Sequence, residues 1–293
     1  MFYRRKLLLS LIQGLNRPVQ KVDLQKYLFL LCVSQDKPSY EFIPHRFGCY
    51  SFQIDADKRT LTKYGLIKNR DEWQLSDDTR YLHLLTAHDR DRVNNIVREF
   101  GEIRGRRLIK HVYKNYPYYA INSEIRADVL TLREQQVVES SRPSPASATL
   151  FTIGYEGKTL ERFLNQLIQH RIKILCDVRR NPVSMKFGFS KNPLMRAVNA
   201  IGITYVHIPA LGIASAKRSN LTTQDHYDSL FEEYRRTTLA DNGASLDEVM
   251  RLIRRQGRTA LMCFEEGPQQ CHRGCVAEAL QARPEFRYRM VHL

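Results

Sequence analysis

The 293-residue sequence lacks any apolar run long enough to cross a bilayer, which takes about 18 consecutive apolar residues. Its first residues, MFYRRKLLLSLIQGL, are basic and then apolar, but Gln13, Asn16 and Arg17 interrupt the stretch and no small-residue cleavage site follows. We therefore expect an amphipathic first helix in a cytoplasmic protein, with no membrane as its partner.

Cysteine is scarce as well, with six in the chain and three of them close together near the C-terminus. This distribution does not suit a disulfide framework, which small secreted domains use to stabilise their small cores. The chain is long enough for two domains with separate cores, and its 43% hydrophobic and 26% charged residues are typical of a globular protein.

Acidic residues are outnumbered, because 31 Asp and Glu face 46 Lys and Arg and leave a net charge of +15. Such a surplus is either a generic property of a basic protein or the mark of a polyanionic partner, since neutralised phosphates release condensed counterions. Charge by itself does not separate DNA, RNA and an anionic membrane surface. Together with the motifs below, it favours nucleic acid, DNA before RNA, with a homodimer as the candidate assembly.

The composition changes at 139–149, where the stretch ESSRPSPASAT carries two prolines and small polar residues without apolar periodicity. We expect a linker there, between an N-terminal domain at residues 1–138 and a C-terminal domain at 150–293.

The N-terminal half is expected to be mainly helical. Asp23 is placed to cap a second helix, whose apolar residues recur at helical spacing. A further helix ends over Thr60–Ile67 with a stop at Gly65, and a turn at 69–72 and a short strand at 73–75 follow. This order resembles winged helix-turn-helix domains, and the resemblance implies nucleic-acid binding.

A basic segment, Gly101–Tyr119, strengthens that expectation. Its cations are Arg104, Arg106, Arg107, Lys110 and Lys114, and tyrosines stand at positions 113, 116, 118 and 119. Guanidinium and ammonium groups suit phosphates, and tyrosine rings can stack on bases. The alternative is a solvated basic helix face with the tyrosines in the core; the neighbouring winged-helix pattern favours the nucleic-acid interface.

The C-terminal half alternates strands and helices. Strands are expected at 150–153, 173–178, 204–208, 259–264 and 287–292, and helices at 160–169, 194–201, 230–239, 246–255 and 274–281. This alternation predicts an α/β fold, with a mostly parallel sheet flanked by helices.

Polar residues follow several of these strands. They include Tyr155 and Glu156 after the first strand, Asp177, Arg179 and Ser184 after the second, His207 at the third, and Cys263 and Glu265 at the fourth. Sites in parallel sheets form at the carboxyl ends of the strands. We therefore expect these side chains to meet at one edge of the sheet.

Residues 150–293 resemble the domain of unknown function four-eight-eight family. The resemblance rests on Thr152-Ile153-Gly154-Tyr155, Asp177-Val178-Arg179 with Pro182 and Ser184, Gly202-Ile203-Thr204-Tyr205, Leu211-Gly212, and Cys263-x-Glu265 through Cys271-His272-Arg273. It implies an α/β fold and a site at these residues, and says little about the reaction. Ile213 departs from the pattern, because many members carry a second glycine there.

The residue types permit a specific chemistry. Asp177 and Glu265 can form a carboxylate pair for cleavage or transfer at a sugar carbon, with His272 orienting a group or carrying a proton. Arg179 and Arg273 can hold phosphates. Tyr155 and Ser184 complete the expected substrate site.

Other interpretations of the same residues stay open. Asp177–Arg273 and Glu265–Arg179 can be ion pairs that tie the sheet together. Cys263 suits core packing, whereas Cys271 at a helix start beside Arg273 can have a lowered pKa and serve thiol chemistry.

Cys263, Cys271, His272 and Cys275 offer four ligands suited to tetrahedral zinc. However, the adjacent residues Cys271 and His272 rarely both reach one metal. We therefore assign no metal ligand and no cofactor.

These expectations combine into an enzyme that acts on nucleic acid at a modified base or sugar, as a DNA glycosylase does. An extruded base would stack on Phe187, Phe189 or Tyr155. The alternative is a non-catalytic DNA-binding regulator or phage-defence sensor whose C-terminal pocket recognises a nucleotide or modified base.

Overall fold

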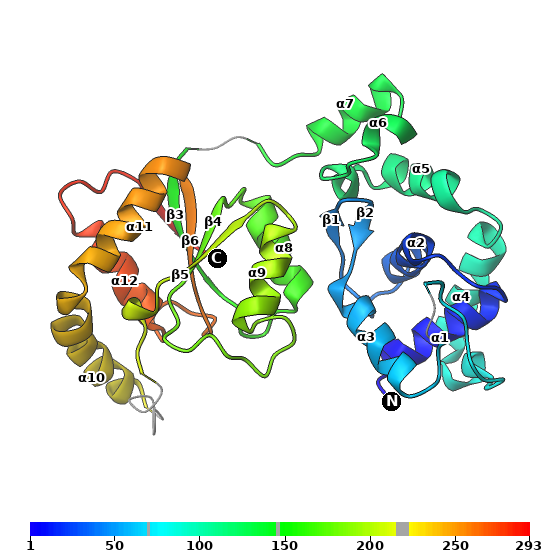
Figure 1. Cartoon of the computed structure of the whole chain (residues 1–293), viewed down its shortest axis with the longest axis horizontal. Helices are drawn as coiled ribbons and strands as arrows, with labels where there is room; N and C mark the ends of the chain where they lie inside the picture. Colours follow the sequence, from blue (N-terminus) through cyan, green and yellow to red (C-terminus); the bar gives the residue numbers. More distant parts are fainter. Residues whose placement is uncertain (69–70, 145–146, 215–222) are drawn as a thin grey trace. The chain divides into compact units, whose positions relative to one another are not determined.

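The computed structural model describes residues 1–68, 71–144, 147–214 and 223–293. The chain divides into two compact units, Met1–Arg142 and Pro143–Leu293 (Figure 1). The expected linker at 139–149 overlaps the end of one helix and the first residue of a strand, and its residues 145–146 lie outside the described part.

The N-terminal unit is mainly helical. Its helices are α1 (Tyr3–Leu15), α2 (Lys21–Val33), α3 (Phe52–Lys63), α4 (Ala87–Phe100), α5 (Gly105–Asn115), α6 (Arg126–Val129) and α7 (Leu132–Ser140), with 3-10 turns at Tyr81–Leu84 and Pro117–Ala120. Strands β1 (Ile43–His45) and β2 (Gly48–Tyr50) pair as an antiparallel hairpin. The unit packs around α2, in which Leu24, Tyr27, Leu28 and Leu31 are fully buried.

Asp23 does not cap α2, and this expectation was wrong. The helix begins at Lys21, with Gln20 at its N-cap, and Asp23 lies in the first turn. The Asp23 carboxylate instead accepts a hydrogen bond of 2.9 Å from the backbone N–H of Gly105, at the start of α5. A carboxylate can satisfy a free N–H of any nearby helix start, so its sequence position alone does not identify the helix it caps.

The expected helix stop at Gly65 is confirmed, because α3 ends at Lys63 and Gly65 has a φ of +71°. The short strand at 73–75 was wrong: Trp73 and Leu75 form isolated bridges with Val19 and Ile67. Part of the expected turn, residues 69–70, lies outside the described part. The resemblance to winged-helix domains therefore stays a prediction.

The C-terminal unit is an α/β domain, as expected. Its sheet has the order β5-β4-β6-β3-β7. The strands are β3 (Thr149–Gly154), β4 (Ile174–Asp177), β5 (Thr204–His207), β6 (Arg258–Cys263) and β7 (Arg289–His292), and the neighbouring strands in the described chain pair in parallel. The central strands are buried on both faces, which explains their continuous apolar runs.

Helices cover both faces of this sheet (Figure 1). Helices α8 (Leu160–Gln169) and α9 (Lys191–Asn199) lie on one face, and α11 (Gly243–Gln256) and α12 (His272–Gln281) lie on the other. Helix α10 (Gln224–Tyr234) continues into a π turn at Arg235–Leu239, and a 3-10 turn at Pro209–Leu211 follows β5.

The strand order places a crevice at the centre of the sheet. Strand β6 lies between β4 and β3. The chain leaves β3 and β4 through α8 and α9 on one face of the sheet, and it leaves β6 through α12 on the opposite face. Loops that separate in this way open a crevice outside the carboxyl ends of the strands. The residues after β3, β4 and β6 therefore surround one space.

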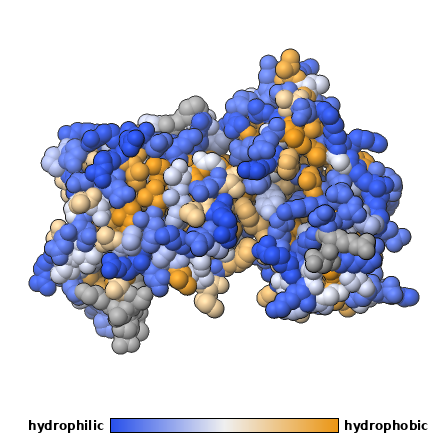
Figure 2. Space-filling view, viewed as in Figure 1, coloured by the Kyte–Doolittle hydropathy of each residue, from blue (hydrophilic) through white to orange (hydrophobic). Residues whose placement is uncertain are grey.

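Among the described helices, none has both the length and the apolar character that crossing a bilayer requires. On the face shown in Figure 2, hydrophilic residues cover much of both units.

Candidate active site

A pocket of about 300 Å³ lies at the carboxyl ends of β3, β4 and β6. It is lined by Tyr155, Arg179, Arg180, Asn181, Val183, Ser184, Met185, Ile213, Cys263 and Phe264. Small-molecule pockets have volumes of about 300 to 1,000 Å³, so this one suits a single base or sugar better than a length of polymer.

The loop after β6 lies directly on the end of β3. Gly154 is in register with Cys263, and a Cβ at Gly154 would stand 1.8 Å from the carbonyl oxygen of Glu265. The backbone N–H groups of Tyr155 and Glu156 both donate to the carbonyl of Phe264, at 3.0 and 2.9 Å. Only glycine allows this approach, which brings Cys263 and Glu265 beside Tyr155.

Asp177 and Arg179 form a buried bidentate ion pair. Arg179 donates from Nε to Asp177 Oδ1 at 2.8 Å and from Nη2 to Oδ2 at 2.6 Å, and Oδ2 also accepts from the Tyr205 hydroxyl at 2.6 Å. Burial by itself would lower the pKa of the Arg179 guanidinium, but the Asp177 carboxylate outweighs it and raises that pKa. Arg179 therefore lines the pocket as one half of a fixed ion pair with Asp177.

Tyr155 is packed between Arg179 and an aromatic ring. Its ring stacks on Phe189 at 4.3 Å between centroids and 9° between planes, and its hydroxyl accepts from Arg179 Nη1 at 3.0 Å. Both Tyr155 and Phe189 are buried, so they stack on each other. The exposed aromatic residue on the pocket wall is Phe264, which is 41% exposed.

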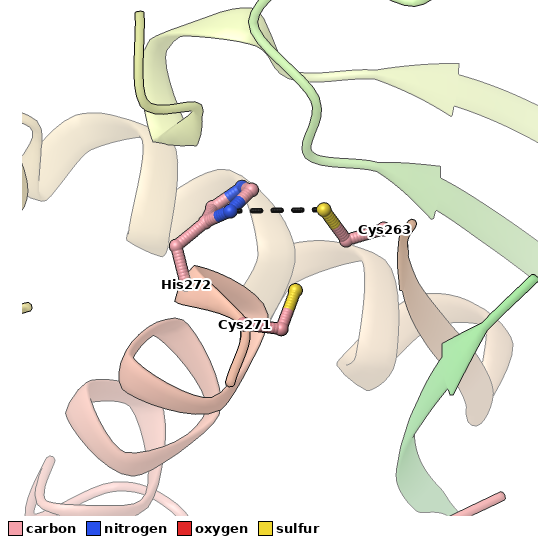
Figure 3. A group of neighbouring side chains, drawn as sticks. All are labelled: Cys263, Cys271 and His272. Carbon is pink, nitrogen blue, oxygen red and sulfur yellow. Dashed lines mark hydrogen bonds between the residues drawn. The ribbon is translucent and has the colours of Figure 1, made fainter. Parts of the chain in front are cut away.

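Cys263 at the end of β6 and His272 at the start of α12 face each other (Figure 3). The Nδ1 atom of His272 lies 3.6 Å from Cys263 Sγ, and Nε2 lies 3.0 Å from the carbonyl oxygen of Val178. A carbonyl can only accept, so Nε2 carries a hydrogen, and in the neutral ring Nδ1 is the lone-pair atom that faces the thiol. Both side chains are buried, and Cys263 also lines the pocket.

Cys271 completes this group of side chains. It is the N-cap of α12 with an extended backbone, and its Sγ, Cys263 Sγ and a ring nitrogen of His272 all lie within 4.8 Å of one another. Cys271 and His272 are adjacent in the sequence, and we did not expect both side chains to approach one metal position. They do so because His272 is the first residue of α12, whereas Cys271 before it has an extended backbone. Cys275 is not part of the group.

The lowered pKa expected for the Cys271 thiol was wrong. Burial raises its pKa well above the ordinary value, and the neighbouring Cys263 and Glu265 act in the same direction, while Arg273 opposes them. The thiol is 1% exposed, so the helix start does not offset the loss of solvent.

Arg273 does not line the pocket in the way a phosphate ligand would. It is fully buried, and its Nη1 and Nη2 atoms donate to the carbonyl oxygens of Glu265 and Glu266 at 2.5 and 2.7 Å. Its Nε atom has no hydrogen-bond partner among the described residues. Arg273 therefore holds the backbone of the loop that carries Glu265.

Asp177 and Glu265 belong to different groups of side chains. Both oxygens of Asp177 are bonded to Arg179 and Tyr205 and the side chain is fully buried, whereas Glu265 is half-buried and accepts from Cys263 Sγ at 3.4 Å. The geometry gives Asp177 a positioning role and leaves Glu265 as the carboxylate beside the pocket. The ion pair present is Asp177–Arg179, which neither of the two expected pairings anticipated.

Sequence reasoning missed several contributions. Cys263 was interpreted as core, although its place on the same strand face as Glu265 was a signal for a site residue. Arg180 and Asn181 on the pocket wall follow directly after Arg179 in the sequence. Tyr205 stood in the family segment Gly202-Ile203-Thr204-Tyr205, but its contact with Asp177 was not expected, because that contact depends on β5 lying next to β4.

The basic segment of the N-terminal unit forms helix α5 and its cap. Arg104, Arg106, Arg107 and Lys114 are exposed, and Lys110 is half-buried. Lys110 and Lys114 pair with Glu134 at 3.6 and 3.3 Å.

The tyrosines of this segment are not placed for stacking on bases. Tyr113 is buried and bonds Ser123 at 2.7 Å, and the half-buried Tyr116 and Tyr119 pack edge-on against Phe29. The structure favours the alternative of tyrosines packed inward, because Tyr113 lies on the buried face of the amphipathic α5 and Tyr116 and Tyr119 contact Phe29 just after that helix.

Residues 159–280 match the family model described as "Domain of unknown function DUF488". The match confirms the family resemblance over most of the C-terminal unit, including Asp177, Arg179, Ser184, Glu265 and the Cys271-His272-Arg273 run. Tyr155 lies just before the matched segment. No curated protein and no solved structure matches the chain.

Proposed function

We propose that the chain is an enzyme that acts on nucleic acid. Its C-terminal pocket receives one nucleotide, and the reaction cleaves or transfers at the base or sugar, as in a DNA glycosylase. The observation that carries the proposal is the pocket itself, whose lining combines Arg179 and Arg180 with Cys263, the neighbour of Glu265.

The pocket chemistry favours an anionic ligand of limited size. Arg179 is held rigidly by Asp177 and Tyr155, while Arg180 is exposed. The exposed Arg180 guanidinium supplies the positive charge and the donors for a phosphate, because Asp177 balances the charge of Arg179. The volume of about 300 Å³ accommodates one base or sugar, so a duplex substrate would have to extrude its nucleotide.

Glu265 is the group assigned to the chemistry. It is a half-buried carboxylate next to the pocket, and Arg273 and the contact with Gly154 fix the backbone that carries it. A positioned carboxylate can act as general base or can stabilise positive charge that develops on a sugar. Asp177 acts through Arg179, which it positions.

The N-terminal unit would hold the polymer. Exposed Arg106 and Arg107 on α5, with the net charge of +15, supply the sequence-independent attraction that nucleic-acid enzymes need. This interaction fixes no base, so substrate choice rests with the pocket.

The test is mass spectrometry of bases and fragments released from plain and modified DNA and RNA. Wild type and Glu266→Gln, a matched control with an exposed side chain, should release a free base, whereas Glu265→Gln should not. Cut strands that keep all their bases would assign a nuclease instead. If no substrate reacts but a nucleotide in the pocket changes DNA affinity, the protein is a regulator or defence sensor.

A further inference from the structure

We propose that Cys263, Cys271 and His272 bind a zinc ion, with the fourth coordination position open toward the pocket. The proposal rests on the ligand geometry, and it stands whether or not nucleic acid is the substrate. The three ligand atoms lie within 4.8 Å of one another and come from the end of β6 and the start of α12. In Figure 3 the two sulfur atoms and the imidazole point into the same space.

The orientation of His272 favours a metal ligand. Metal-binding histidines usually donate their second ring N–H to a carbonyl or carboxylate, which fixes the tautomer and aims the other nitrogen at the metal. His272 has this arrangement, because Nε2 donates to the Val178 carbonyl at 3.0 Å and Nδ1 faces Cys263 Sγ.

The separation of two ligand atoms also fits zinc. With Zn–S near 2.3 Å and Zn–N near 2.0 to 2.1 Å, tetrahedral geometry places a sulfur and a nitrogen ligand about 3.6 Å apart. The distance from Cys263 Sγ to His272 Nδ1 is 3.6 Å. Two thiolates and an imidazole are the ligand types that zinc prefers.

The Cys263, Cys271 and His272 side chains are shielded from bulk solvent. The three side chains are each no more than 1% exposed, yet Cys263 also lines the pocket. A metal held by these side chains would be reached from the pocket past Cys263. Three protein ligands with one open position is the arrangement of catalytic zinc sites, in which a bound water is activated. The Glu265 carboxylate lies next to the cluster, 3.4 Å from Cys263 Sγ.

Cys275 offers a matched control, because it lies on the same helix, is 3% exposed and is outside the cluster. The full-length chain is incubated with zinc, desalted, and analysed by inductively coupled plasma mass spectrometry. We expect one zinc per chain for wild type and Cys275→Ser, and loss of most of the zinc for Cys271→Ser and His272→Asn.

Zinc-free wild type, equal loss in Cys275→Ser, or full retention in Cys271→Ser would each overturn the proposal. If the ligand variants do not fold, cobalt replaces zinc in the wild type. Its thiolate-to-cobalt charge-transfer band should have the intensity of two thiolates, and a spectrum without that band rejects the site. Neither measurement uses a substrate, so a failure here is distinct from a failure of base release.

Discussion

Asp177 and Arg179 are two residues apart in the sequence and form a complete bidentate pair, with Nε–Oδ1 at 2.8 Å and Nη2–Oδ2 at 2.6 Å. The Arg179 side chain is 7% exposed and that of Asp177 is fully buried. Asp177 is the last residue of β4 and Arg179 lines the pocket, so the pair holds the Arg179 guanidinium rigidly at the pocket wall. Asp177 is therefore engaged in holding Arg179, whereas Glu265 lies next to Cys263.

Replacing Asp177 with Asn should strongly destabilise the C-terminal unit. The substitution leaves the Arg179 charge buried without its counter-charge, which typically costs about 3 to 5 kcal/mol. The free energy of unfolding can be measured with guanidinium by far-UV circular dichroism, which follows both units. Fluorescence of Trp73, the single tryptophan, follows the N-terminal unit and should change little.

Asp247→Asn is the matched control, because Asp247 is 53% exposed and pairs with Arg283 at the surface. Its loss should cost less than about 1 kcal/mol. Equal effects of the two substitutions would mean that the Asp177–Arg179 pair has no special contribution.

Gly154→Ala should disturb the site more than an ordinary glycine substitution. The new Cβ would stand 1.8 Å from the Glu265 carbonyl oxygen, so the loop that carries Glu265 must move. We expect a loss of stability of more than about 1 kcal/mol and a matching loss of any activity that depends on Glu265. Thermal unfolding together with the base-release assay measures both.

Gly243→Ala provides the comparison. Gly243 is the first residue of α11, and a Cβ there meets no atom within 4 Å. Alanine should leave stability unchanged or raise it by up to about 1 kcal/mol. A Gly154→Ala protein as stable and active as Gly243→Ala would contradict the close approach.

The regular elements of the C-terminal unit were predictable from local patterns. Helix α8 was predicted at both ends, because its apolar face recurs at helical spacing. In the structure, Thr159 caps it by accepting from the N–H of Arg162. The buried parallel strands were recognised within two residues at either end, since they are short and apolar. Helix and strand patterns of this kind depend only on residues close together in the sequence, so they can be recognised without the tertiary structure.

The contacts of the site were harder to predict because they depend on tertiary neighbours. Arg273 bonds backbone carbonyls, which no side-chain pattern reveals. Tyr205 reaches Asp177 because β5 lies beside β4, and local sequence patterns do not specify the order of strands in a sheet. Cys271 and His272 approach the same position because α12 begins between them. The Cys263-to-Arg273 motif therefore located the site, whereas the contacts of each residue depend on the tertiary structure.

The N-terminal unit should lose stability on acidification through His45. Burial lowers the pKa of His45 from its ordinary value of 6.5, and neighbouring Arg46 acts in the same direction. The unfolded chain therefore binds a proton at a higher pH than the folded chain. Stability is fully present above the unfolded pKa and declines as the pH falls through 6.5 toward the folded pKa.

The measurement is guanidinium unfolding followed by Trp73 fluorescence at about pH 7.5 and about pH 5. His45→Gln should reduce the difference in unfolding free energy between the two pH values. His83→Gln, at an exposed histidine, should leave that difference as in wild type. If His45→Gln keeps the full difference, other groups carry the pH dependence.

The basic face of α5 gives the last prediction, which tests the nucleic-acid partner directly. Arg106 and Arg107 are exposed, and no ion pair holds them among the described residues. Each phosphate contact contributes about 0.9 to the slope of log affinity against log salt, because binding releases counterions. Arg106→Ala with Arg107→Ala should therefore weaken DNA binding and reduce that slope by about 2. Fluorescence anisotropy over a salt series measures both, and Arg251→Ala with Arg254→Ala removes the same charge from exposed positions on α11. Because both double variants lose two positive charges, an equal reduction of the slope in the two would show that net charge, and not the α5 face, attracts the DNA.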